Sequence, residues 1–270
     1  MGKNNLVDES LIEVREIDEL KLLFRDDCII NDKITIHQPT IREIKEFGEK
    51  NYYSMVSTLC SIPSDMKSIL YDMGIDYNTY PDFNLFVLLS QQFSVEQTRL
   101  LFGDLDFSKM VLAVNPLNDE PCLACEDENG EIIQDGVVID RIIYSSMIQY
   151  VRKMHGIVPQ VDHAMNNYTK KMLIDEDRQR REKTKGKKYT STLLPIIVSL
   201  INTEEFKYNS HNIQDIGIYE LTLSFQQISK KKSAIALLQG SYSGMIDTSK
   251  INKKAFNWAY VPIEDKELNN

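Results

Sequence analysis

The chain has 270 residues, of which 42% are hydrophobic and 26% charged, and its formal net charge is −9 at pH 7. This composition is sufficient for a real hydrophobic core in one large domain or two small ones. The negative charge argues against a surface built mainly to neutralise a phosphate backbone. Four cysteines, no secretory leader pattern and no long apolar run predict a reducing cytoplasm, no disulfide framework, no secretion signal and no membrane span.

Residues 1–39 are expected to form an N-terminal arm and a β-hairpin. Apolar residues recur every three positions between Leu11 and Leu20, which predicts either a short amphipathic helix or a loosely attached arm. Residues 22–30 and 33–36 are β-rich and flank Asn31-Asp32, a pair that suits a tight hairpin turn.

Residues 40–104 read as a helical part. Thr40 and Glu43 have capping-box spacing before a helix over 41–59, in which Gly48 is the weak point. A short helix is expected between Pro63 and Gly74. Two more follow, one capped by Asp82 and one with a second capping box at Ser94 and Gln97. The apolar character of these last two on all sides predicts that both are buried.

Residues 105–140 are expected to form a small antiparallel β unit. The β-rich segments are 107–114, 121–125, 131–134 and 137–140, and Asn129-Gly130 between two of them is the strongest hairpin signal in the chain. The fold class is therefore α+β and predominantly helical, with an N-terminal β-hairpin and this β unit in the middle.

Residues 141–270 are expected to form a second helical part. Asp140 has the position of a cap for a helix that ends at His155-Gly156, and helical patterns follow over residues 161–182, 190–201 and 213–238. Residues 240–244, with glycine at both ends, are predicted to interrupt the last helix. A C-terminal docking tail over 240–270 would follow.

The end of the second of these helices is strongly basic and is predicted to form a linker over residues 178–188. Seven candidate polyanion-binding residues lie there within eleven positions: Arg178, Arg180, Arg181, Lys183, Lys185, Lys187 and Lys188. Such a run suits nucleic acid, a membrane surface or an acidic partner, but a solvated linker is the commoner explanation. Tyr189 is the only aromatic residue beside it that could stack on a base.

The chain offers no catalytic signature. Cys122 and Cys125 have metal-like spacing without a second close pair, so two packed strand residues are the simpler interpretation. Loop solvation explains the carboxylate pairs Asp26-Asp27, Asp104-Asp106 and Asp175-Asp177 better than acid–base chemistry does. No catalytic residue, metal or cofactor is therefore expected, and the protein is not expected to be an enzyme.

The C-terminal tail carries spaced apolar anchors in an otherwise polar segment. Its candidate partner-binding residues are Tyr242, Ile246, Ile251, Phe256 and Trp258. Two interpretations stay open: the tail folds back and buries these side chains, or it docks on a neighbouring subunit.

Three segments together carry a family resemblance. They are residues 34–56 (ITIHQPTIREIKEFGEKNYYSMV), residues 83–110 (FNLFVLLSQQFSVEQTRLLFGDLDFSKM) and the ending that combines IYELTLSFQQI with LLQGSYSGMIDTSKINKKAFNW. In this order they resemble tail-region proteins of tailed bacteriophages from low-GC Gram-positive hosts, regarded as tail or baseplate assembly proteins. The basic run is not part of that pattern.

The resemblance implies a non-enzymatic tail or baseplate protein, either a structural component or an assembly chaperone, acting through protein contacts in the virion or in the host cytoplasm. Other tail or baseplate proteins, or further copies of the chain, would be its partners. The alternative is a nucleic-acid-binding accessory protein that uses residues 178–188.

Overall fold

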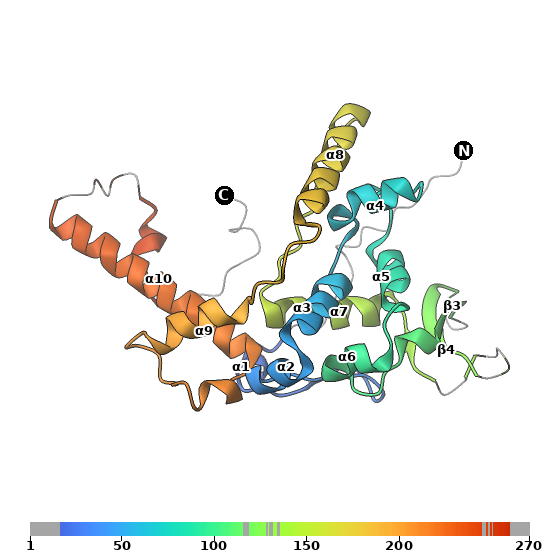
Figure 1. Cartoon of the computed structure of the whole chain (residues 1–270), viewed down its shortest axis with the longest axis horizontal. Helices are drawn as coiled ribbons and strands as arrows, with labels where there is room; N and C mark the ends of the chain where they lie inside the picture. Colours follow the sequence, from blue (N-terminus) through green and yellow to red (C-terminus); the bar gives the residue numbers. More distant parts are fainter. Residues whose placement is uncertain are drawn as a thin grey trace.

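The computed structural model describes residues 17–115, 119–127, 129, 132–133, 136–244, 247, 249 and 251–259. Within them the chain is predominantly helical, with a two-stranded antiparallel sheet near the N-terminus and a three-stranded antiparallel sheet in the middle (Figure 1). The predicted fold class is confirmed. Along the described chain, no helix combines the length and apolar character needed to cross a membrane.

The α-helices are α1 Glu19–Leu23, α2 Ile41–Phe47, α3 Glu49–Leu59, α4 Lys67–Asp72, α5 Asp82–Ser90, α6 Val95–Phe102, α7 Arg141–His155, α8 Asn167–Thr184, α9 Leu193–Ile201 and α10 Ile218–Tyr242. The strands are β1 Cys28–Ile29, β2 Thr35–Ile36, β3 Met110–Val114, β4 Pro121–Cys125 and β5 Val138–Ile139. Short 3₁₀ turns include η2 Pro63–Asp65, η3 Phe107–Lys109, η4 Ile213–Asp215 and η6 Lys253–Phe256.

The N-terminal hairpin is present but shorter than predicted. β1 and β2 pair antiparallel, and the Asn31 side chain accepts hydrogen bonds from the backbone N–H groups of Lys33 and Ile34 in the turn. Leu22 and Leu23, expected in the first strand, instead belong to α1, which the Asp18 side chain caps. Burial of Leu22 in the main core fixes this helical turn despite its β-rich sequence.

Local capping signals predict the helix starts of the first helical part well. Thr40 and Glu43 form a reciprocal capping box at α2, as do Ser94 and Gln97 at α6. Gly48 has φ +96° and splits the predicted 41–59 helix into α2 and α3. At α5 the cap position is Pro81, so Asp82 is the first helical residue rather than the predicted cap.

Helix α5 is buried on two sides because it separates two apolar clusters. Phe83, Phe86 and Val87 join the main core, whereas Leu85 and Leu89 belong to a second cluster that includes residues of α4 and α8. This placement explains why its sequence is apolar all round, and it confirms the predicted burial of α5.

Helix α7 runs through the middle of the molecule and carries a large share of the main core. Met147, Val151 and Met154 are fully buried along one face of the helix. Asp140 caps its first turn, and Gly156, with φ +65°, ends it, as predicted. Figure 1 shows α3, α5 and α10 arranged along this helix.

The middle sheet has the order β3-β4-β5, with Leu112 opposite Leu123 and Leu123 opposite Ile139. The predicted segment 131–134 contributes an isolated bridge between Glu126 and Ile132. Gly130 of the predicted Asn129-Gly130 turn lies outside the described residues.

The last three helices differ from their predicted limits. Helix α8 begins at Asn167, after an extended approach, because Asn166 caps it there. The helix expected over 213–238 is divided into η4 and α10. Helix α10 also continues through Gly240 to Tyr242, and Gly244, with φ +69°, follows it. In Figure 1, α8 and α10 project from the body in different directions.

Candidate functional site

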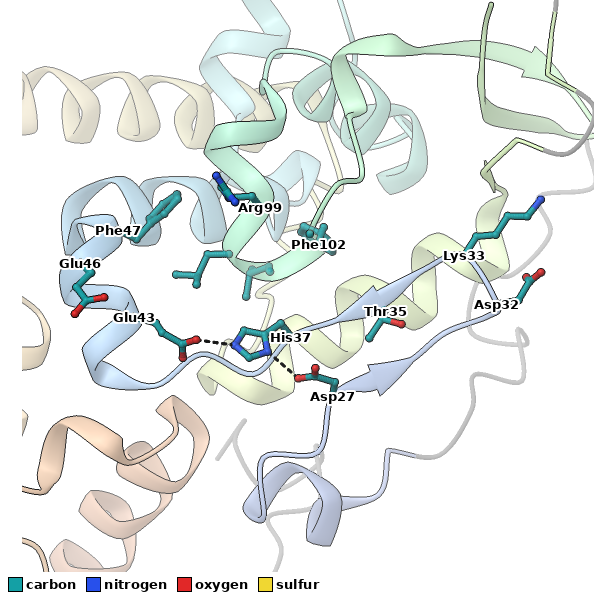
Figure 2. Close-up of a pocket in the computed structure, with 13 residues that line it drawn as sticks. Asp27, Asp32, Lys33, Thr35, His37, Glu43, Glu46, Phe47, Arg99 and Phe102 are labelled. Carbon is teal, nitrogen blue, oxygen red and sulfur yellow. Dashed lines mark hydrogen bonds and ion pairs between the residues drawn. The ribbon is translucent and has the colours of Figure 1, made fainter.

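An open pocket of about 900 Å³ lies between the N-terminal hairpin, α2 and the end of α6. Figure 2 shows Glu43 and Phe47 of α2 on one side and Arg99 and Phe102 of α6 on another. Lys33 lies further along the hairpin. Charges of both signs therefore line this pocket.

The centre of this pocket is His37, which lies between two carboxylates (Figure 2). Its Nδ1 is 2.9 Å from Asp27 Oδ1, and its Nε2 is 3.2 Å from Glu43 Oε1. Its backbone N–H donates to the carbonyl of Leu101 at 2.8 Å. Only a doubly protonated imidazole can donate to both carboxylates at once.

Both carboxylates have structural partners as well. Glu43 Oε2 accepts bonds of 2.7 Å from the backbone N–H and the hydroxyl of Thr40, and Asp27 accepts from the backbone N–H of Gln38. Burial would raise the pKa of Glu43, but the Thr40 hydrogen bonds and the His37 ring outweigh it and lower the pKa. The hydrogen bonds of these three side chains therefore connect the N-terminal hairpin to α2.

The basic segment divides into paired arginines and exposed lysines. Arg178 pairs with Asp72 at 2.7 Å, and Arg180 and Arg181 pair with Asp177 at 2.6 and 2.9 Å. Four lysines remain exposed on the last turn of α8 and the loop after it: Lys183, Lys185, Lys187 and Lys188. Arg178 and Arg181 also bond to Asp72 and to the Asp65 carbonyl outside α8, whereas Arg180 pairs within the helix, and the lysines form the solvated end.

Asp177 corrects one expectation, since loop solvation does not describe it. Its side chain is 1% exposed and accepts hydrogen bonds from the backbone N–H and hydroxyl of Ser68 at 3.0 and 2.6 Å. Burial would raise the pKa of Asp177, but the bonds from Ser68, Arg181 and Arg180 hold it well below its usual range. The sequence names Asp177 but does not reveal this environment, because Ser68 on α4 lies 109 positions away.

Helix α9 presents an apolar patch to solvent. Leu193 and Leu200 are buried, while Leu194 is 60% and Val198 46% exposed. Leu194 and Val198 are four residues apart and so share one face of the helix, with Pro195 exposed beside them. We call Leu194, Pro195 and Val198 the α9 patch.

The start of α9 is held by a residue from another helix. Glu49 of α3 accepts hydrogen bonds from the backbone N–H groups of Thr192 and Leu193 at 2.7 and 2.9 Å. Burial would raise the pKa of Glu49, but these bonds and those from neighbouring residues lower it. A remote carboxylate thus fixes the orientation of the α9 patch.

The described part of the C-terminal tail returns along α10. Gln227 Nε2 donates to the Trp258 carbonyl at 2.5 Å, and Lys230 Nζ donates to the Ala259 carbonyl at 3.1 Å. Figure 1 shows η6 beside α10. The tail therefore contacts its own chain through backbone carbonyls.

The five predicted tail anchors have different environments. Ile251 and Phe256 are half-buried, Trp258 is 55% exposed and Tyr242, at the end of α10, is 86% exposed. Ile246 lies outside the described residues. Docking by these side chains stays a prediction.

Cys122 and Cys125 both lie on β4, where Cys122 is buried and Cys125 half-buried, and both are free thiols. Burial raises the pKa of Cys122, with the nearby Asp140 adding to the effect. No group of three or more metal-ligating side chains occurs within the described ranges.

Residues 183–260 match a protein family described as the YomV second domain, which is a phage-associated family. Comparison with curated proteins and with solved structures gives no match. The matched segment covers less than a third of the chain and contains the exposed lysines, α9, α10 and η6. It is in this segment, rather than around His37, that the chain is similar to a phage-associated domain.

Proposed function

We propose that the chain is a non-enzymatic protein of tailed bacteriophages that acts through protein contacts in tail or baseplate assembly. It would serve as a structural component or as an assembly chaperone, in the virion or in the host cytoplasm. The observation that carries the proposal is the α9 patch, because it places exposed apolar side chains within the segment that matches the YomV second domain.

Leaving large apolar side chains exposed to water is energetically unfavourable. A helix as apolar as α9 normally buries most of its surface, yet two of its large side chains are about half exposed or more. Exposed apolar residues grouped on one rigid face are typical of surfaces that a partner covers. Tyr242 and Trp258 extend the apolar character of the same segment.

Mass spectrometry of purified particles and of assembly intermediates tests this proposal. A structural component remains in the finished particle, whereas a chaperone occurs only in intermediates. Absence from both would overturn the proposal.

A nucleic-acid-binding accessory protein is the second candidate. It is favoured by the exposed lysines at the end of α8, which projects from the body. The pairing of all three arginines with carboxylates weakens it, because those guanidinium groups are already engaged within the chain.

A further inference from the structure

A second cavity, of about 160 Å³, lies between the start of α5 and one face of α7. Its lining includes Arg141, Ser145, Gln149 and Arg152, which recur at helical spacing along α7. A cavity of this size accepts a group of a few atoms rather than a nucleotide. We call it the Arg141 pocket.

Two arginines, Arg141 and Arg152, line the same small cavity. Arg152 is fixed because its Nε and Nη2 atoms both donate to the Cys60 carbonyl, at 3.2 and 2.9 Å. Its Nη1 atom is not used in that contact. The group is therefore held in place by the protein before any ligand arrives, which reduces the entropy that binding would cost.

Arg141 is unusual because its Nε atom is buried without a hydrogen-bond partner among the described residues. Buried polar groups are nearly always paired, and an unpaired donor destabilises the fold. Arg141 and Arg152 line the same cavity, and guanidinium groups are the donors best suited to pair with a carboxylate.

The other lining residues restrict the anion. Phe83 and Ile148 are each 1% exposed and supply apolar surface, which suits an aliphatic stem. Asp82 also lines the pocket, so its carboxylate and the two guanidinium groups leave a net charge of about +1. This balance favours a singly charged carboxylate over a doubly charged phosphate.

We propose that the Arg141 pocket binds a carboxylate carried on a short aliphatic stem. A glutamate side chain of a protein partner and a small organic acid share this chemistry. Arg141 and Arg152 pair with the carboxylate, while Phe83 and Ile148 contact the stem. This inference is independent of the proposed phage function.

The full chain, labelled at isoleucine methyl groups, can be titrated by NMR with capped glutamate, glutarate, capped glutamine and inorganic phosphate. We expect both carboxylates to shift the Ile148 methyl signal saturably, with a Kd of about 1 to 10 mM, and capped glutamine not to do so. Tighter binding of capped glutamate identifies a protein side chain as the ligand, and tighter binding of glutarate identifies a small acid. Tighter binding of phosphate than of either carboxylate would overturn the assignment.

Substitution separates binding from folding. Arg141→Met removes the unpaired Nε, so the melting temperature without ligand is expected to rise by about 2 °C, while carboxylate binding weakens at least about tenfold. Arg141→Lys keeps the charge but loses the planar guanidinium that can donate two hydrogen bonds to one carboxylate, so it should also weaken binding. Lys50→Met is a control at an exposed cation outside the pocket. Unchanged carboxylate affinity in both Arg141 variants would overturn the proposal.

Discussion

Asp177 is the residue on which most of the polar contact between α4 and α8 depends. Replacing it with Asn keeps the shape but removes the charge that two arginines neutralise, so we expect a loss of about 2 to 3 kcal/mol in the free energy of unfolding. Urea unfolding measures this loss. Asp175→Asn is the matched control, since its side chain is 50% exposed and its pair with Arg178 is longer, at 3.4 Å. Equal losses in both variants would contradict the assignment.

Asp177 should also make the free energy of unfolding depend on pH. Because the pKa of Asp177 is lower in the folded chain than in the unfolded chain, its contribution is complete above about pH 4. The contribution decreases as the pH falls below that value. We expect Asp177→Asn to flatten the unfolding free energy between about pH 4 and pH 2, and a curve parallel to that of the wild type would contradict this.

His155 should make the stability of the fold depend on pH in a second, higher range. Tyr52 donates to its Nε2 at 2.6 Å when Nδ1–H donates to the Val151 carbonyl at 2.7 Å, so the buried ring is neutral. Burial lowers the pKa of His155 to about 4, although the bond to Val151 opposes this.

Since the unfolded chain binds a proton at about pH 6.5, stability should fall as the pH decreases from 6.5 to 4, by about 1 kcal/mol per pH unit. His155→Gln should remove this slope, and His211→Gln, at an exposed histidine, should retain it. Thermal unfolding across this pH range is the measurement. An unchanged slope in His155→Gln would show that another group is responsible.

At the scale of elements, the exposed lysines after α8 distinguish the two candidate functions. Four phosphate contacts would weaken DNA or RNA binding about a hundredfold between about 50 and 200 mM salt. We expect instead a weak binding signal that changes little when Lys183, Lys185, Lys187 and Lys188 are all replaced by Gln. Fluorescence anisotropy over this salt range is the measurement, and a steep response that the substitutions remove would favour nucleic-acid binding.

The elements also show how far sequence reasoning extends. The capping boxes at Thr40 and Ser94 are predictable because both partners lie within one turn of the chain. The cap that Glu49 provides for α9 is not, because its partners are 143 and 144 residues away and the pattern of neither segment reveals the other. The same limit applies to the Arg141 pocket, whose Phe83 and Arg152 meet only after folding.

At the scale of the whole molecule, the candidate site was only partly predictable. The basic run and the tail anchors were visible as patterns, whereas the sequence predicted a helix over residues 190–201 but not which of its faces is exposed. Hydrophobicity alone cannot say which face of a short apolar helix its neighbours cover. The exposure of Leu194 and Val198 therefore depends on how α9 packs against the rest of the chain.

The arrangement of the molecule supports a division of roles. A main core around α7 stabilises the body, the α4–α8 contact adds a second cluster, and the segment that matches the YomV second domain carries the α9 patch. We propose that a partner covers this patch, which Glu49 holds in place, during assembly.

Complementation of a phage that lacks this gene tests that claim most directly, with complete tails counted by electron microscopy. We predict that the wild-type chain and Leu112→Ser, a control at a 60% exposed residue of β3, restore tails. The double variant Leu194→Ser/Val198→Ser should fold with an unchanged melting temperature but yield at least about tenfold fewer tails, which corresponds to about 1.4 kcal/mol of lost contact energy. Full restoration of tails by that double variant would contradict the account.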